Sequence, residues 1–184
     1  FLMNSMPEYS ALFVANSSSV RNIQLYNKDK TMKVFCNRGT NGIEGTLSTA
    51  IGYAAIHEGE VFLLVGDLSF FYDLNSLWNF KIPGNLHIML INNGGGGIFH
   101  LLPGLENAES LDNFVSASHS KGAVKWIEAT DLDYLKADNY DELNNVANEF
   151  LREKRGNSVI LEIMTDKTNN KKAVDQYYNN IKNK

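Results

Sequence analysis

Asp67 and Asn93 are the two residues of this 184-residue chain whose types and positions point most directly to metal chemistry. Each follows a short apolar run, Val61–Val65 in one case and Leu86–Ile91 in the other. Carboxylate and amide oxygens are hard ligands that suit Mg²⁺, which completes its octahedron with phosphate oxygens, carbonyls and water. We therefore predict that the two side chains bind a divalent cation bridged to a diphosphate.

The neighbouring residues would let a diphosphate approach the backbone. Gly66 presents no side chain, and Ser69 opens a predicted helix whose N-terminus attracts anions. The run Gly94–Gly97 offers amides and carbonyls without obstruction. Two simpler interpretations stay open at this point: Asp67 could cap the helix, and Asn93 with its neighbours could form a turn.

The two apolar runs have the length and the flanking residues of buried parallel strands. The segment Ser69–Lys81 between them is long enough for one crossover helix, so the stretch predicts a βαβ unit. Ligands of open parallel sheets bind at the carboxyl ends of the strands. Asp67 and Asn93 should therefore lie near each other on that edge.

Strands and helices alternate along the rest of the chain. Further strands are expected at 11–15, 33–35, 132–136 and 158–164. Further helices are expected at 18–26, 46–57, 118–129, 141–154 and 171–181, with an irregular loop at 98–114. This alternation predicts an α/β fold: a doubly wound, mostly parallel sheet with helices on both faces.

Two more predicted strand ends carry polar residues or glycine, at Asn16-Ser17 and at 37–39. Four such ends on one edge indicate a ligand with phosphate or carboxylate groups. Arg21 and Arg38 would then be candidates for bidentate carboxylate binding. Taken alone, both arginines would be solvated surface charges in most proteins.

Composition limits the alternatives. A net charge of −4 leaves no basic footprint for nucleic acid, and the single cysteine, Cys36, excludes an internal disulfide framework. No apolar run has transmembrane length and no signal peptide is apparent, so we expect a cytoplasmic protein without a membrane span. The chain begins at Phe1 without an initiator Met. We expect residues 1–10 to be linker from a missing upstream region and 11–184 to be one domain.

The pairing of Gly66-Asp67 with Asn92-Asn93 resembles the diphosphate motif of thiamine-diphosphate enzymes. In that family the Asp, the second Asn and a backbone carbonyl two residues later bind the metal, which corresponds here to Asp67, Asn93 and Gly95. The resemblance implies thiamine diphosphate and Mg²⁺ or Mn²⁺ as cofactors. It also implies further cofactor contacts, at Gly39, Ile43, Gly66, Leu68, Ser69, Gly96 and Ile98.

Leu68 replaces the glycine usual in the family, and the segment 66–77 resembles one branch of it. That branch decarboxylates 2-oxoglutarate and transfers the succinyl unit to isochorismate in menaquinone biosynthesis. The segments 13–21, 37–50 and 96–103 resemble the same branch. By this resemblance the substrates would contact Ser17, Arg21, Arg38, Phe99 and Leu102.

The resemblance covers only the C-terminal, diphosphate-binding domain of such enzymes. The glutamate that activates the cofactor lies in a pyrimidine-binding domain, which a neighbouring subunit supplies. We therefore expect no catalytic residue within this chain, no activity from it alone, and a homodimer or homotetramer. Two alternatives stay open: another thiamine-diphosphate decarboxylase or acetolactate-type synthase, and a non-catalytic diphosphate-binding module.

Overall fold

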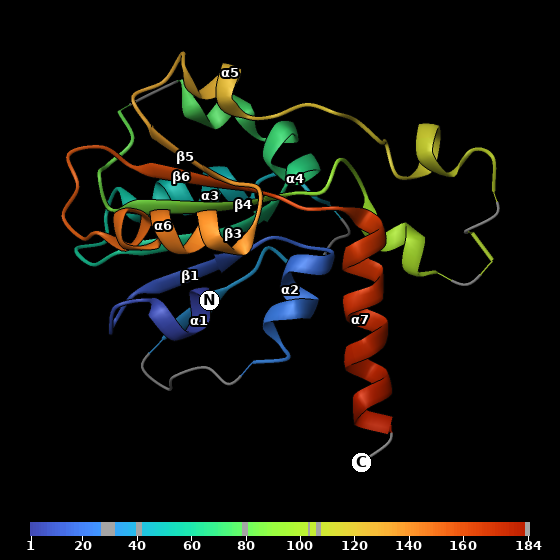
Figure 1. Ribbon diagram of the computed structural model, residues 1–184. Coiled ribbons are helices and arrows are strands. Elements are labelled where there is room, and N and C mark those ends of the chain that lie inside the picture. The colour runs from blue at the N-terminus through green and yellow to red at the C-terminus, as the bar shows by residue number, and fades with distance from the viewer. Residues whose placement is uncertain (27–31, 40–41, 79–80, 103, 106–107, 183–184) are drawn as a thin grey trace.

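The computed structural model describes residues 1–26, 32–39, 42–78, 81–102, 104–105 and 108–182. Within these residues six strands form one all-parallel sheet in the order β2-β1-β3-β4-β6-β5 (Figure 1). The strands are β1 (Ala11–Val14), β2 (Lys33–Phe35), β3 (Val61–Gly66), β4 (Leu86–Asn92), β5 (Asp133–Ala137) and β6 (Val159–Met164). The predicted α/β class is confirmed, as are all six predicted strands to within a residue at each end.

Helices cover both faces of the sheet (Figure 1). The α-helices are α1 (Leu2–Ser5), α2 (Ser18–Ile23), α3 (Thr46–Ala54), α4 (Asp67–Tyr72), α5 (Val124–Ile127), α6 (Tyr140–Leu151) and α7 (Lys167–Lys182). Shorter helical turns are η1 (Leu74–Leu77), η2 (Gly97–Leu101) and η3 (Leu111–Val115). None of the helices in the described ranges is long and apolar enough to cross a membrane.

Alternating side chains of the central strands build two cores. In β3, Leu63 points into the core shared with α3, α4 and α5, whereas Phe62 points into the core shared with α1, α2 and α6. Both side chains are fully buried. This is why the strand sequences are apolar throughout rather than alternating with polar residues.

The strand order reverses between β1 and β3, because β2 lies on one side of β1 and β3 on the other. In open parallel sheets this reversal opens a crevice at the carboxyl ends of the two strands, where ligands bind. The crevice is therefore flanked by Ser17 after β1 and by Asp67 after β3.

Two helix predictions were wrong in extent. The crossover helix expected at 69–81 is instead α4 followed by η1, because the Asp73 carboxylate accepts hydrogen bonds from the Ser48 amide and hydroxyl and the helix ends there. The helix expected at 118–129 is reduced to α5. The amides of His119 and Ala123 donate outside the segment, to Gly94 O and to the Glu162 carboxylate, so residues 118–123 do not form a helix.

Other elements differ at their ends. Helices α2 and α3 end three residues earlier than predicted, and the loop expected at 98–114 contains the turns η2 and η3. Helix α6 has the predicted acidic first turn, but it ends at Leu151 and has no basic residue in its last turn. Helix α7 begins four residues early, has no buried residue and projects away from the sheet (Figure 1).

A buried polar pair lies at the amino edge of the sheet. His87 is fully buried in β4, with Nδ1 2.6 Å from the Phe150 carbonyl and Nε2 2.8 Å from Glu60 Oε2. The Lys154 amide donates to Glu60 Oε1 at 3.1 Å. Burial alone would raise the pKa of Glu60, but the contacts with His87 and Lys154 outweigh it and lower that pKa. The ionised carboxylate therefore stabilises the fold.

We predict that Glu60→Gln lowers the free energy of unfolding at pH 7 by about 1–3 kcal/mol, because hydrogen bonds to a charged acceptor are lost. A carboxylate with a lowered pKa contributes stability above its unfolded pKa and loses it as pH falls through the folded pKa. The difference from the unsubstituted chain should therefore shrink between pH 5 and about pH 3 in urea titrations. Glu128→Gln, at an exposed carboxylate, is the control. A difference that stays constant over this range would contradict the assignment.

Candidate diphosphate and metal site

The four polar or glycine-rich strand ends lie side by side along the carboxyl edge of the sheet. They follow β2, β1, β3 and β4, which are consecutive neighbours in the sheet. Two asparagine side chains donate hydrogen bonds to the backbone of this edge. Asn16 donates to the carbonyls of Asn37 and Gly42, and Asn37 donates to Gly45 O and Thr49 Oγ1. These amide side chains thus hold the segment after β2 in place rather than facing a ligand.

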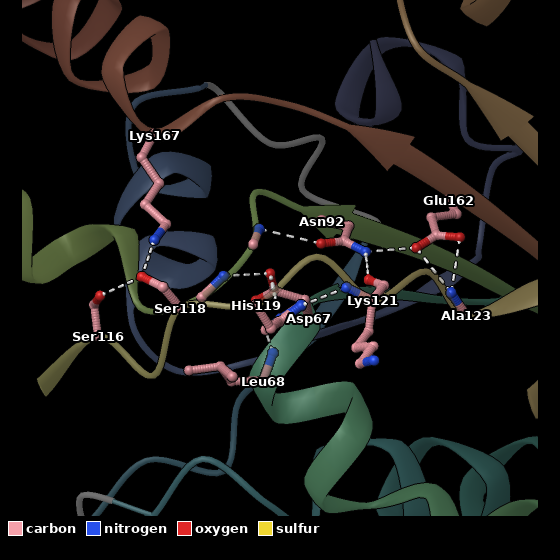
Figure 2. A network of polar contacts seen from close by, with 12 residues as sticks. Asp67, Leu68, Asn92, Ser116, Ser118, His119, Lys121, Ala123, Glu162 and Lys167 are labelled. Carbon is pink, nitrogen blue, oxygen red and sulfur yellow. Dashed lines mark hydrogen bonds and ion pairs between the residues drawn. The ribbon is translucent and has the colours of Figure 1, made fainter. Parts of the chain in front are cut away.

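Asp67 is the buried carboxylate at the centre of this edge. Its Oδ1 accepts a hydrogen bond from the Leu68 amide at 2.7 Å, and Oδ2 accepts one from the Gly95 amide at 2.8 Å (Figure 2). Gly66 is the N-cap residue of α4, and Asp67 is the first residue inside the helix. Asp67 is therefore not the N-cap residue, and its side chain instead joins the first turn of α4 to the glycine-rich loop that follows β4.

The charge of Asp67 is incompletely compensated. Burial raises the pKa of this carboxyl, and the amides of Gly95 and Leu68 and the nearby His119 oppose the rise only in part. His119 Nε2 lies 3.3 Å from Asp67 Oδ2 without the alignment of a hydrogen bond. The described residues place no Lys or Arg in an ion pair with Asp67. A buried, backbone-lined carboxylate without a fixed cation is suited to a divalent metal ion.

The glycine run after β4 fits tightly against the segment 116–119. Gly94 and Gly95 have φ values of +73° and +133°, and an added Cβ would lie 2.7 Å from His119 O and 2.6 Å from Ser116 O, respectively. The Gly96 amide donates to the same Ser116 carbonyl at 2.6 Å. Close packing and backbone conformation both require glycine at positions 94 and 95.

The two asparagines after β4 have different environments. Asn92 is buried; its Nδ2 donates to Lys121 O at 2.8 Å and Glu162 Oε1 at 2.6 Å, and its Oδ1 accepts from the Gly94 amide at 3.2 Å. The half-buried Asn93 makes no side-chain hydrogen bond to another described residue, and its Nδ2 lies over Gly97. Asn92 is therefore structural, and Asn93 remains available to a ligand at this edge.

Of the three predicted metal ligands, the structure brings two into direct contact, since the Gly95 amide binds Asp67. The Gly95 carbonyl accepts the Gly97 amide at 2.9 Å, which leaves a second lone pair. The described residues contain no cluster of three His, Cys, Asp or Glu side chains that could hold a metal. A metal site here would need one carboxylate, one amide, a carbonyl and oxygens from the ligand, and Asp67, Asn93 and Gly95 fit that donor set.

The other predicted cofactor contacts line the same edge. Ser69 is buried in α4, Ile43 and Ile98 are half-buried, and Gly39 is exposed with φ +145°. Residues 40–41, which fall within the resembling segment 37–50, lie outside the described residues. Gly66 has an open side, since an added Cβ would have no neighbour within 4 Å.

The predicted substrate contacts follow three strands of the sheet, β1, β2 and β4, with β3 between β1 and β4. Arg21 in α2 and Arg38 after β2 are exposed, and neither forms an ion pair with a described residue. Ser17 has φ 72°, a conformation rare outside glycine that often marks a functional constraint. Phe99 lies against Gly96, and Leu102 is 45% exposed.

The sequence interpretation missed His119, Ser116 and Glu162. Only Glu162 carried a signal, because it is an acidic residue within the otherwise apolar strand β6. A buried carboxylate must be hydrogen-bonded, so such a residue marks a polar network. His119 and Ser116 lie in a segment whose position depends on tertiary contacts alone.

A parallel α/β sheet with a buried carboxylate and a glycine turn at its carboxyl edge is typical of domains that bind a phosphorylated cofactor. The sequence profile described as "Thiamine pyrophosphate enzyme, C-terminal TPP binding domain" matches residues 17–163. The chain belongs to this family. The fold and the expected class of cofactor-binding domain are thereby confirmed.

Three more similar relatives within the family all have the same name. The chain is 45% identical over 183 residues to the "2-succinyl-5-enolpyruvyl-6-hydroxy-3-cyclohexene-1-carboxylate synthase" of Bacteroides fragilis, covering 99% of this chain and 33% of that protein. The proteins of the same name from Phocaeicola vulgatus and Christiangramia forsetii are 44% and 40% identical over 184 and 181 residues, covering 100% and 98% of this chain and 33% and 31% of those proteins. The chain thus spans about a third of the length of these relatives.

We predict that Gly95→Ala lowers the free energy of unfolding by about 1–3 kcal/mol, because alanine is strained at φ +133° and its Cβ would meet Ser116 O. Gly66→Ala is the matched control. Its φ is −85° and no atom would contact the new Cβ, so its stability should change by less than about 0.5 kcal/mol. Thermal and urea denaturation measure both. Equal stability of the two variants would contradict the packing described for the glycine run.

Proposed function

We propose that this chain is the diphosphate-binding domain of a synthase that decarboxylates 2-oxoglutarate and joins the succinyl unit to isochorismate in menaquinone biosynthesis. The observation that carries the proposal is the similarity of the whole chain, at 40–45% identity, to proteins named as this synthase. Leu68, which replaces the glycine usual in thiamine-diphosphate enzymes, supports the same branch.

Asp67, Asn93 and the Gly95 carbonyl would hold Mg²⁺ or Mn²⁺, and the metal would bridge to the diphosphate. The buried position of Asp67 and its lack of a fixed cation support this assignment. Backbone groups of Gly39, Gly66, Leu68, Ser69 and Gly96 would approach the diphosphate, with Ile43 and Ile98 in apolar contact with the cofactor. When bound, thiamine diphosphate supplies the electron sink for decarboxylation and carbon–carbon bond formation.

The substrates are acids, and the chain's part in their recognition would be electrostatic. 2-Oxoglutarate keeps a distal carboxylate after decarboxylation, and isochorismate carries two carboxylates. Arg21 and Arg38 would bind the succinyl carboxylate together with Ser17, since both guanidinium groups are free of ion pairs within the described residues. Phe99 and Leu102 would exclude water from the reacting end of the substrate.

In this proposal the carboxyl edge of the sheet forms only half of the active site. A pyrimidine-binding domain of a neighbouring subunit would cover it and supply the activating glutamate, which makes the working unit a homodimer or homotetramer. Glu44 and Glu58 lie in the wrong segments for that role. The whole-protein test is therefore decarboxylation of 2-oxoglutarate by the complete protein, measured with and without isochorismate. Turnover of pyruvate instead of 2-oxoglutarate would favour another decarboxylase of the family.

We predict that Asp67→Ala abolishes Mg²⁺-dependent binding of thiamine diphosphate to the complete protein, because the variant lacks the only carboxylate proposed for the metal. Isothermal titration calorimetry with and without Mg²⁺ measures the effect. Asp131→Ala, at an exposed carboxylate, is the control. Unchanged cofactor affinity in Asp67→Ala would refute the metal assignment.

We predict that Arg21→Ala and Arg38→Ala each lower kcat/KM for 2-oxoglutarate by about 10- to 150-fold, the kinetic equivalent of losing one charged hydrogen bond of about 1.5–3 kcal/mol. Cofactor affinity should stay nearly unchanged, and Lys should restore activity only in part because it lacks the planar fork. Arg152→Ala, at an exposed arginine after α6, is the control. Normal kinetics for both substrates would show that the two arginines are surface charges.

A further inference from the structure

Glu162 is a fully buried carboxylate in the middle of β6, only 1% exposed. Its neighbours Val159, Ile160 and Leu161 on the same strand are buried and apolar, so an apolar side chain would be the simplest occupant of this position. No described Lys, Arg or His forms an ion pair with it. A buried carboxylate of this kind is tolerated only where hydrogen bonds replace the lost water.

Three residues from three different elements supply these hydrogen bonds. Asn92 Nδ2 at the end of β4 donates to Oε1 at 2.6 Å, and the Tyr134 hydroxyl of β5 donates to Oε2 at 2.6 Å. The Ala123 amide, just before α5, donates to both oxygens at 3.0–3.1 Å. Burial first, and then the hydrogen bond and charge of Glu162, raise the pKa of Tyr134, so its hydroxyl keeps its proton and stays a donor.

Further hydrogen bonds connect Glu162 and Asn92 to the carboxyl edge of the sheet, where the proposed cofactor site lies (Figure 2). Asn92 uses its other amide hydrogen on Lys121 O and its oxygen on the Gly94 amide. The Lys121 amide donates to His119 Nδ1 at 3.1 Å, and the other ring nitrogen, Nε2, faces Asp67. The His119 amide donates to Gly94 O at 3.0 Å. Every hydrogen-bonding atom of the Asn92 amide is thereby used.

We propose that Glu162 is a positioning residue for the proposed cofactor site. Through Asn92 and the segment His119–Ala123, its carboxylate sets the geometry of the loop Asn93–Gly97 and the orientation of His119 beside Asp67. It touches neither metal nor cofactor. The inference rests on the function proposed above, and groups of this kind typically change metal affinity by about 10- to 100-fold when they are altered.

The most informative variants exchange the amide and the carboxylate. Asn92→Asp sets two carboxylates against each other and removes the donor to Lys121 O, while the Gly94 amide keeps an acceptor. Glu162→Gln preserves the shape, but its NH₂ group replaces one of the two oxygens that accept from the Ala123 amide, so one contact of the carboxylate is lost. Combining the two substitutions restores an amide–carboxylate hydrogen bond in the opposite direction, whereas the hydrogen bond to Lys121 O stays lost.

The experiment measures Mg²⁺-dependent affinity for thiamine diphosphate in the complete protein by calorimetry. We expect Glu162→Gln and Asn92→Asp each to bind about 10- to 100-fold more weakly than the unsubstituted protein, and the double variant to bind more tightly than Asn92→Asp alone. Glu60→Gln, which changes a buried carboxylate at the opposite edge, should reduce stability without reducing affinity.

A second measurement needs no cofactor. Hydrogen exchange of the Gly94 and Ala123 amides should accelerate in Asn92→Asp and slow again in the double variant. The inference is overturned if Glu162→Gln or Asn92→Asp binds as tightly as the unsubstituted protein, if the double variant recovers nothing, or if Glu60→Gln loses as much affinity. A protein that binds no thiamine diphosphate before substitution would overturn the proposed function, whereas the exchange data would still report on the network.

Discussion

The parallel pairing of β3 with β4, with Gly66 opposite Ile91, is the constraint on which the site depends. This register brings both strands to an end at the same level, so that the start of α4 at Asp67 faces the loop that begins at Asn93. The hydrogen bond from the Gly95 amide to Asp67 then becomes possible without any long side chain. A slip of one residue in this register would turn alternate side chains to the opposite face and separate the two loops.

The features that suit this carboxyl edge to ligand binding also lower its local stability. Asp67 is buried with its charge incompletely compensated, Ser17 and Gly95 have positive φ, and Gly94–Gly97 gains no side-chain burial. Opposite features hold at the amino edge, where Glu60 and His87 are paired and the pKa of Glu60 is lowered. Two buried carboxylates thus lie at opposite ends of β3 and have different roles. Asp67 is available to a ligand, whereas Glu60 is paired with His87 and stabilises the fold.

The strands and the shared edge of Asp67 and Asn93 could be predicted from the sequence, because they follow from local sequence patterns. Apolar runs bounded by Gly66 and by Asn92 identify the strands, and parallel connection then places Asp67 and Asn93 on one edge. The structural role of Asn92 could not be predicted from residue type, because it depends on Glu162, 70 residues away in the chain. For the same reason the helix expected at 118–129 was wrong: hydrogen bonds to Gly94 and Glu162 outweigh the local preference for helix.

The loss of helix at 118–123 connects these observations. In a helix over 118–129 the Ala123 amide would bond to the carbonyl of His119, and the Glu162 carboxylate would lose this donor. Glu162 would then be a buried charge with one donor fewer, which costs about 1–3 kcal/mol. The hydrogen bonds to Glu162 and to Gly94 O thus favour the non-helical conformation of the segment, and that conformation places His119 beside Asp67. An acidic residue inside an apolar strand accordingly determines both the local backbone conformation and the geometry of a site that it does not touch.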